Sequence, residues 1–161
     1  MNNTTKNSAI LAAYRILSHA RNTEGQLRDK LERQGYDTES VDAAIVFAKD
    51  NKYIADEEYI ERAIDILANE KLYGPARIPV ELTRRGFTRP LILSIDMNEI
   101  RDGGSYGDTE IDFALNCARL IEKRGGLDED GRVGRKLYAV LQRYGYTGDI
   151  IRQAVNSINE R

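Results

Sequence analysis

The sequence has 161 residues, of which 41% are hydrophobic, 31% are charged and three are proline. This composition is typical of a folded protein, and its net charge of −2 does not by itself require a nucleic acid or an anionic membrane as partner. The single cysteine, Cys117, excludes an internal disulfide and fits a reducing compartment. No run approaches the roughly 18 apolar residues of a membrane span, so we expect no membrane association and a cytoplasmic protein.

Nine segments show the apolar spacing of an amphipathic helix, and none alternates convincingly at a period of two. We expect residues 1–7 to be disordered. Thr23 and Gln26 match a capping box, and Asp56 and Asp108 suit N-caps of later helices. The predicted helices cover residues 8–20, 23–34, 38–51, 56–72, 77–85, 89–97, 109–124, 131–144 and 148–159. The sequence therefore predicts an all-α protein.

Three segments align without gaps, at residues 27–36, 78–87 and 137–146, and each reads apolar-x-x-x-Leu-x-Arg-x-Gly-aromatic. Glycine just beyond a helix adopts a positive φ without steric cost, and the next residue then contacts the leucine of the last turn. Each copy therefore predicts the same way of ending a helix, with mainly structural residues. This repeat signature comprises Leu31, Gly35, Tyr36, Leu82, Gly86, Phe87, Leu141, Gly145 and Tyr146.

The helices group into three repeats of three helices each, over residues 8–54, 55–97 and 109–161, and the second repeat is basic. Residues 98–108 include Gly103, Gly104 and Gly107 among several acidic residues. This segment is expected to be a flexible acidic linker.

The sequence resembles the RecX family, the small bacterial regulators of the RecA recombinase. The match rests on residues 13–17 (AYRIL) with 23–31 (TEGQLRDKL), on 53–59 (YIADEEY) with 73–78 (YGPARI), and on the threefold Arg-x-Gly-aromatic ending. It extends over about residues 9–156. One departure is Pro79, where the family usually has another residue; we expect the fifth helix to hold Pro79 in its first turn, because proline is tolerated there.

The resemblance implies three tandem three-helix repeats in an elongated, curved arrangement. It also implies a protein that binds the RecA filament on single-stranded DNA. We further expect a monomer, with a possible weak DNA contact. Such a protein modulates, and is expected to inhibit, the filament's ATP hydrolysis, strand exchange and repressor cleavage.

Residues 71–89 carry the clearest candidate contact surface. Five cations stand against one anion, Glu81, for a local charge of +4, and Tyr73 lies beside two of the cations. This segment either contacts an acidic partner or a DNA backbone, or is a solvated face that complements helix ends; Arg84 repeats at a helix end and suits the second reading. The candidate partner-binding residues are Lys71, Tyr73, Arg77, Arg84, Arg85 and Arg89.

The sequence lacks the combinations of residues that catalysis or metal binding would need. His19 is the only histidine and is expected to complement the end of the first helix, and Cys117 fits a core position. A Cys–His nucleophile or a transition-metal cluster needs further ligands. We therefore expect no enzyme, no cofactor and no metal.

Two other functions remain open from the residues alone. Three-helix modules can bind DNA directly through a helix-turn-helix geometry, although only the second repeat is clearly basic. The chain could equally be a helical adaptor with an unrelated protein partner.

Overall fold

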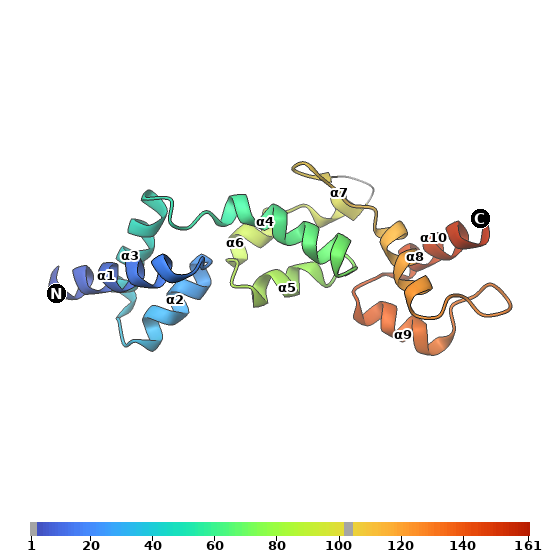
Figure 1. Cartoon of the computed structure of the whole chain (residues 1–161), viewed down its shortest axis with the longest axis horizontal. Coiled ribbons are helices and arrows are strands. Elements are labelled where there is room, and N and C mark those ends of the chain that lie inside the picture. Colours follow the sequence, from blue (N-terminus) through green and yellow to red (C-terminus); the bar gives the residue numbers. More distant parts are fainter. Residues whose placement is uncertain (1–2, 102–104) are drawn as a thin grey trace. The chain divides into compact units, whose positions relative to one another are not determined.

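The computed structural model describes residues 3–101 and 105–161, and over these ranges the regular structure is helical apart from one short hairpin (Figure 1). The elements in chain order are α1 (Asn3–His19), α2 (Glu24–Arg33), α3 (Thr38–Asp50), α4 (Asp56–Asp65), the π-helix η1 (Ile66–Glu70), α5 (Ile78–Arg84), α6 (Arg89–Leu93), α7 (Met97–Arg101), β1 (Ser105–Tyr106), β2 (Thr109–Glu110), α8 (Phe113–Lys123), α9 (Arg135–Arg143) and α10 (Gly148–Asn159). The predicted all-α class is confirmed.

The first three helices pack around a common apolar core. Its fully buried members include Ala9 and Ala13 of α1, Leu27 of α2, and Val41 and Ala44 of α3. The small side chains of α1 allow α3 to approach it closely. The predicted capping box is confirmed, because Thr23 and Gln26 exchange side-chain and backbone hydrogen bonds at the start of α2.

The predicted disorder of residues 1–7 is corrected over residues 3–7, which belong to α1. Two contacts hold this first part of the helix on its neighbours. The Lys6 ammonium lies 2.6 Å from the Glu39 carboxylate, and the hydroxyls of Ser8 and Tyr36 lie 3.0 Å apart. Tertiary contacts therefore extend a helix through residues whose local preference is weak.

The fourth predicted helix changes its hydrogen-bonding pattern after Asp65, where η1 begins. The Lys71 N–H donates to the Ile66 carbonyl over 2.9 Å, which is the wide turn of a π-helix. Asn116 of α8 is 1% exposed, and its amide donates to the Ala68 carbonyl and to the Asn69 side chain. A buried amide from a distant helix thus satisfies the Ala68 carbonyl, which a regular α-helix would pair within itself.

The segment from residue 89 to residue 112 departs most from the predictions. The helix expected over 89–97 ends at Leu93, as α6. The expected linker at 98–108 instead holds most of α7 and a hairpin in which Ser105 pairs with Glu110. Buried Ile100 and Ile111 anchor the two sides of this segment. Gly103 and Gly104 lie outside the described residues. The expected linker is therefore corrected to ordered structure for the described part.

The helix predicted from residue 109 begins only at Phe113. Asp112 is its N-cap, and the Asp112 carboxylate accepts the Leu115 N–H over 2.8 Å. Asp108 instead lies in the hairpin, where its own N–H donates to the Glu61 carboxylate. The predicted cap at Asp108 is wrong because the hairpin pairs the residues on both sides of it.

All three repeat signatures end a helix as predicted. Gly35, Gly86 and Gly145 have φ values of 88°, 81° and 92°, in the left-handed region. The leucine of each copy is fully buried. The N–H of Tyr36 returns to the Leu31 carbonyl and that of Tyr146 to the Leu141 carbonyl, as a Schellman motif requires.

Pro79 is the second residue of α5, so its ring occupies the first turn as expected. A turn over residues 75–77 precedes it, and the Ile78 N–H donates to the Gly74 carbonyl over 3.3 Å. Pro75 thus begins the helical path, at a position where proline is favoured because no partner for its missing N–H is needed.

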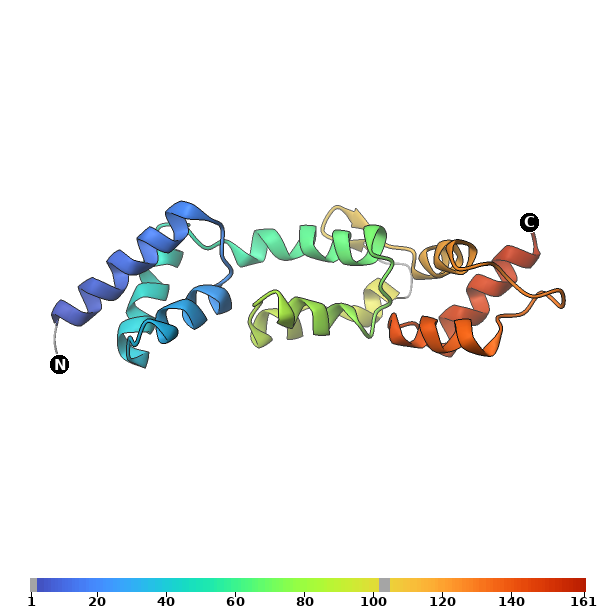
Figure 2. The same cartoon turned by 60° about the horizontal axis from the view of Figure 1, so that its bottom comes forward.

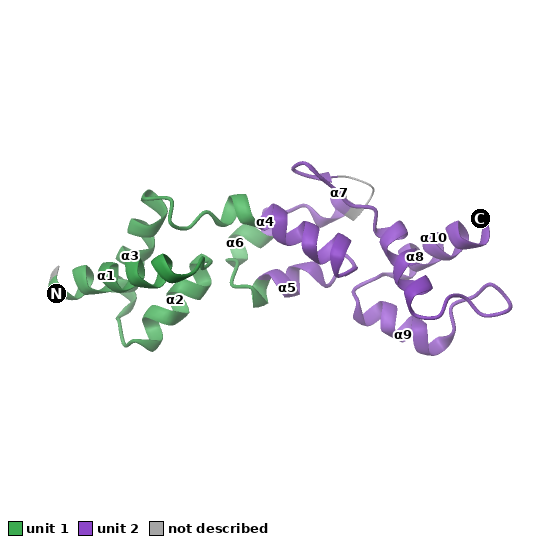
Figure 3. Ribbon diagram, in the orientation of Figure 1, with its two compact units in different colours: residues 1–59, 83–92 green, residues 60–82, 93–161 purple. Residues whose placement is uncertain are grey.

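The chain divides into two compact units (Figure 3). The first contains residues 1–59 and 83–92, and the second contains residues 60–82 and 93–161. The first and third repeats each lie in one unit, whereas the middle repeat contributes to both.

In the first unit, the beginning of α2 meets the end of α5. The Gly25 N–H donates to the Gly86 carbonyl over 3.1 Å, and the Thr23 hydroxyl donates to the Arg85 carbonyl over 3.2 Å. A Cβ built on Gly25 would lie 2.5 Å from the Gly86 oxygen, so only glycine permits this approach. We call this contact the first joint.

The second unit contains an equivalent joint between the beginning of α5 and the end of α9. The Gly74 N–H donates to the Tyr144 carbonyl over 2.7 Å, and the Ala76 N–H donates to the Gly145 carbonyl over 3.2 Å. Gly74 and Ala76 occupy the positions that Thr23 and Gly25 hold in the first repeat. In both joints, N–H groups at a helix start satisfy carbonyls at a helix end, and the two helix dipoles meet with opposite charge.

The third repeat buries the apolar faces of α8, α9 and α10 against one another (Figure 2, orange to red). Cys117 is fully buried in this core, as predicted, and desolvation raises the pKa of its thiol to about 12. The predicted eighth helix begins at Arg135 rather than residue 131, because Gly134 is its N-cap.

Candidate partner-binding surfaces

Arg77 is held by internal contacts at the second joint. Its Nε donates to Glu81 over 3.0 Å, and its Nη1 donates to the Arg143 carbonyl at the end of α9 over 2.8 Å. Its guanidinium also lies 4.4 Å from the centre of the Tyr73 ring. A cation at this place complements the negative end of α9. Arg77 therefore stabilises the joint, and the sequence-based assignment to a partner surface is not the role that its contacts indicate.

Tyr73 is engaged in the same cluster. Its ring meets that of Tyr144 edge to face, with 5.4 Å between centres, and the Arg77 guanidinium covers it. Base stacking needs an open ring face. The ring contacts of Tyr73 thus favour a structural role over the stacking role that its cationic neighbours suggested.

The other predicted cations have more accessible positions. Lys71, Arg84 and Arg89 are exposed and Arg85 is half-buried. Within the described residues, the side chains of Arg85 and Arg89 make no ion pair. Lys71 lies in the second unit and the three arginines in the first, so each group is considered separately.

Lys71 lies in a basic pocket of about 270 Å³ in the second unit. Its other cations are Lys123 and Arg124, at the end of α8. The Arg124 guanidinium donates to the Tyr144 hydroxyl over 2.8 Å. Sequence reasoning missed this grouping because the cations lie some fifty residues apart; the adjacent pair Lys123-Arg124 was the available signal.

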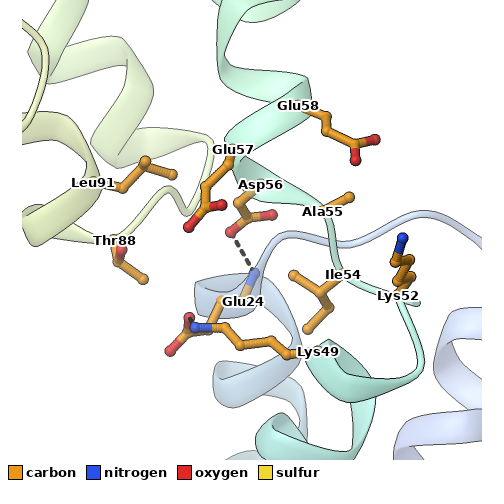
Figure 4. A pocket seen from close by; sticks show the side chains of 10 residues that line it. All are labelled: Glu24, Lys49, Lys52, Ile54, Ala55, Asp56, Glu57, Glu58, Thr88 and Leu91. Carbon is orange, nitrogen blue, oxygen red and sulfur yellow. Dashed lines mark hydrogen bonds and ion pairs between the residues drawn. The ribbon is translucent and has the colours of Figure 1, made fainter.

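A second pocket, of about 280 Å³, lies in the first unit beneath the start of α4 (Figure 4). Asp56 is 8% exposed there, and its carboxylate accepts the Glu24 N–H over 2.9 Å. Asp56 thus caps α2, not α4 as predicted. Burial raises the pKa of the Asp56 carboxyl, and the Glu24 N–H partly opposes this. Lys49 forms an ion pair with the Glu24 side chain. The pocket as a whole is acidic, because its lining holds four carboxylate residues and only two lysines.

An aromatic group is exposed on the first repeat. The rings of Tyr14 and Tyr53 meet edge to face at 6.0 Å, and Tyr53 also contacts Phe47. Tyr14 is 52% and Tyr53 44% exposed. Half-exposed aromatic rings are frequent at protein–protein contacts, although single exposed apolar residues are also normal.

His19 closes α1 as predicted, because its Nδ1 lies 2.7 Å from the Arg15 carbonyl in the last turn. Among residues 3–101 and 105–161, no group of His, Cys, Asp and Glu side chains has the arrangement of a metal site. None of the helices in the part that the structure describes has the length and apolar character needed to cross a membrane.

Repeated helix ends, joints between repeats and exposed charged surfaces define a helical repeat protein. Residues 9–47 match a family model whose description is "RecX, first three-helix domain". The regulatory protein RecX of Trichlorobacter lovleyi is 32% identical over 89% of this chain and 90% of its own length. The chain belongs to the RecX family.

Two further similarities agree with this membership. The regulatory protein RecX of Clostridium botulinum is 30% identical over 89% of this chain, but the chain spans only 65% of that protein's length. The crystal structure of RecX from Lactobacillus salivarius matches with a TM-score of 0.66 at 18% identity, covering 99% of this chain and all of the other. This structural likeness supports the three-helix repeat fold.

Proposed function

We propose that this protein is a non-catalytic regulator that binds the RecA filament on single-stranded DNA and inhibits its ATP hydrolysis, strand exchange and stimulation of repressor cleavage. The observation that carries the proposal is the 32% identity, over nearly the full length of both chains, to a protein named regulatory protein RecX. We further propose that it acts as a monomer in the cytoplasm.

Arg85 and Arg89 are the best candidates for the filament contact. Like Lys71 of the second unit, their side chains make no ion pair among the described residues, and the two arginines follow one another across the end of α5 and the start of α6. Exposed charges steer association and set its salt dependence more than they set final affinity. A partner with an acidic surface would therefore lose association rate when these charges are reversed.

The test measures ATP hydrolysis by RecA filaments on single-stranded DNA while the protein is titrated in. The variant Arg85→Glu/Arg89→Glu should raise the concentration needed for half inhibition by about 5- to 50-fold, as expected for two charge contacts. The control Arg33→Glu/Lys136→Glu makes the same charge change at two other exposed helical positions and should inhibit like the parent. Arg77 is left unchanged, because its reversal would disrupt the second joint.

No inhibition by the parent protein would refute the proposed function and leave the adaptor hypothesis. A direct DNA-binding function predicts a different result. Inhibition would then occur only at protein concentrations that also saturate the DNA strand when RecA is absent. Both the inhibition and the binding to bare DNA would weaken steeply as the salt concentration rises.

A further inference from the structure

We propose that the basic pocket of the second unit binds the sugar-phosphate backbone of a single nucleic-acid strand. The pocket is formed by Glu70, Lys71, Leu72, Leu120, Lys123, Arg124 and Tyr144. This site adds a nucleic-acid contact to the proposed protein contact. Its test contains no filament, so either proposal can fail without the other.

The pocket concentrates positive charge in a chain of net negative charge. Three cations stand against one carboxylate, Glu70, and the Arg62 guanidinium lies 3.6 Å from that carboxylate and partly neutralises it. Among the described residues, neither the Lys71 nor the Lys123 ammonium makes an ion pair or hydrogen bond. Unpaired cations of this kind attract phosphates and release counterions on binding.

The backbone around the pocket fixes the directions of these cations. Leu72 has a φ of 56°, a left-handed conformation that is unfavourable for a bulky residue. The buried Tyr146 hydroxyl holds it by donating to the Leu72 carbonyl over 3.0 Å. The chain therefore turns sharply after η1 and leaves Lys71 at the pocket. Conformations of this cost persist at functional sites when the surrounding structure supports them.

Arg124 is held in place by Tyr144. One of its amino groups donates to the Tyr144 hydroxyl, and the guanidinium lies 5.6 Å from the centre of that ring. The guanidinium keeps further N–H donors for a ligand, in a planar fork that suits phosphate oxygens. The Gly126 N–H donates to the Ile121 carbonyl, which reduces the negative charge that the end of α8 presents nearby.

The shape and walls favour a sugar-phosphate over a bare anion. A volume of about 270 Å³ exceeds that of a phosphate group alone and leaves space for an adjoining sugar. Leu72 and Leu120 supply apolar walls against which a sugar ring can pack. All three cations are exposed, so a continuous strand can pass the pocket without entering a closed cavity. The Tyr144 ring is occupied by Arg124 and Tyr73, so recognition of bases by stacking is not expected there.

The test measures the fluorescence anisotropy of a labelled oligothymidylate of about 20 nucleotides with the full chain over a range of salt concentrations. The variant Lys71→Gln/Lys123→Gln/Arg124→Gln should weaken binding about 10- to 100-fold and reduce the salt slope by about 2, since each phosphate contact to a single strand contributes about 0.7. The control Arg135→Gln/Lys136→Gln/Arg152→Gln removes three exposed cations from α9 and α10 and should bind within about threefold of the parent.

A second variant, Lys71→Gln/Lys123→Gln, keeps the Arg124–Tyr144 contact and guards against a change in folding. It should lose an intermediate amount of affinity while its melting temperature stays unchanged. Failure of the parent to bind the oligonucleotide, or equal losses in the pocket and control variants, would overturn the proposal. Competition by a polyglutamate peptide at lower concentration than an unlabelled oligonucleotide would overturn it in favour of an acidic protein ligand.

Discussion

The second joint permits a direct test of the contact that links the middle and third repeats within the second unit. A Cβ added to Gly74 would lie 2.5 Å from both the carbonyl carbon and the oxygen of Gly145. Both are backbone atoms, so no side chain can rotate away to relieve the overlap. Gly74→Ala must therefore separate the start of α5 from the end of α9.

The magnitude follows from the interactions lost. The hydrogen bonds from Gly74 to Tyr144 and from Ala76 to Gly145 would lengthen or break, at about 1 kcal/mol each. The displacement of the two backbones adds about 1–3 kcal/mol to the loss of stability. Alanine also reduces the conformational entropy of the unfolded chain, which offsets about 0.5–1 kcal/mol of this loss. We expect a net loss of about 2–4 kcal/mol, which corresponds to a fall of about 6–12 °C in melting temperature for a chain of this size.

Thermal and urea unfolding followed by far-UV circular dichroism measure this loss. Gly134→Ala is the matched control. Gly134 is the N-cap of α9, the second helix of the third repeat, but an added Cβ there would meet no atom within 4 Å. It should change stability by less than about 1 kcal/mol. A Gly74→Ala protein that melts within about 2 °C of the parent, or a control that loses as much, would refute the reasoning.

Three further predictions concern buried groups and the repeat signature. Gly145→Ala should destabilise the protein by at least about 2 kcal/mol more than Gly35→Ala, as measured by urea unfolding. Both residues have a positive φ, but only at Gly145 would an added Cβ meet a backbone atom, the Arg77 nitrogen at 2.5 Å. Equal losses in the two variants would contradict this role of the joint. Asn116→Ala should cost about 2–3 kcal/mol, because it removes the N–H donor that serves the Ala68 carbonyl and the Asn69 side-chain oxygen, and an unchanged urea midpoint would show that η1 does not depend on it. The Cys117 thiol, with its pKa raised to about 12, should react with a disulfide reagent at pH 8 about 1000-fold more slowly than a free thiol until urea unfolds the chain; rapid labelling of the native protein would place Cys117 outside the core.

The repeat signature shows how far local sequence determines this fold. Leucine, glycine and an aromatic residue at fixed spacing predicted three helix ends, and the φ values of Gly35, Gly86 and Gly145 confirm them. Helix ends are readable because their hydrogen bonds join residues only three to five positions apart. The interior of the amphipathic helices was readable for a similar reason, since apolar spacing reports one buried face.

Features that depend on distant partners were not predicted. The π-helix η1 is accompanied by a buried amide on α8, and the order of residues 97–101 and 105–112 follows from the anchors Ile100 and Ile111. The carbonyls of Gly86 and Gly145 also accept backbone hydrogen bonds from the preceding repeat, and no local sequence pattern predicts these bonds. A glycine that ends a helix and a glycine that receives a neighbouring backbone look the same in sequence.

The sequence by itself determined the helical class, the threefold repeat and the family resemblance, because periodicity and helix-ending residues act over a few positions. Only the tertiary structure decided which charges are available to a partner. It engages Arg77 with the end of α9 and brings Lys71 together with Lys123 and Arg124. The physical reason is that a cation's role depends on the groups around it in space, and those groups come from parts of the chain far apart in sequence.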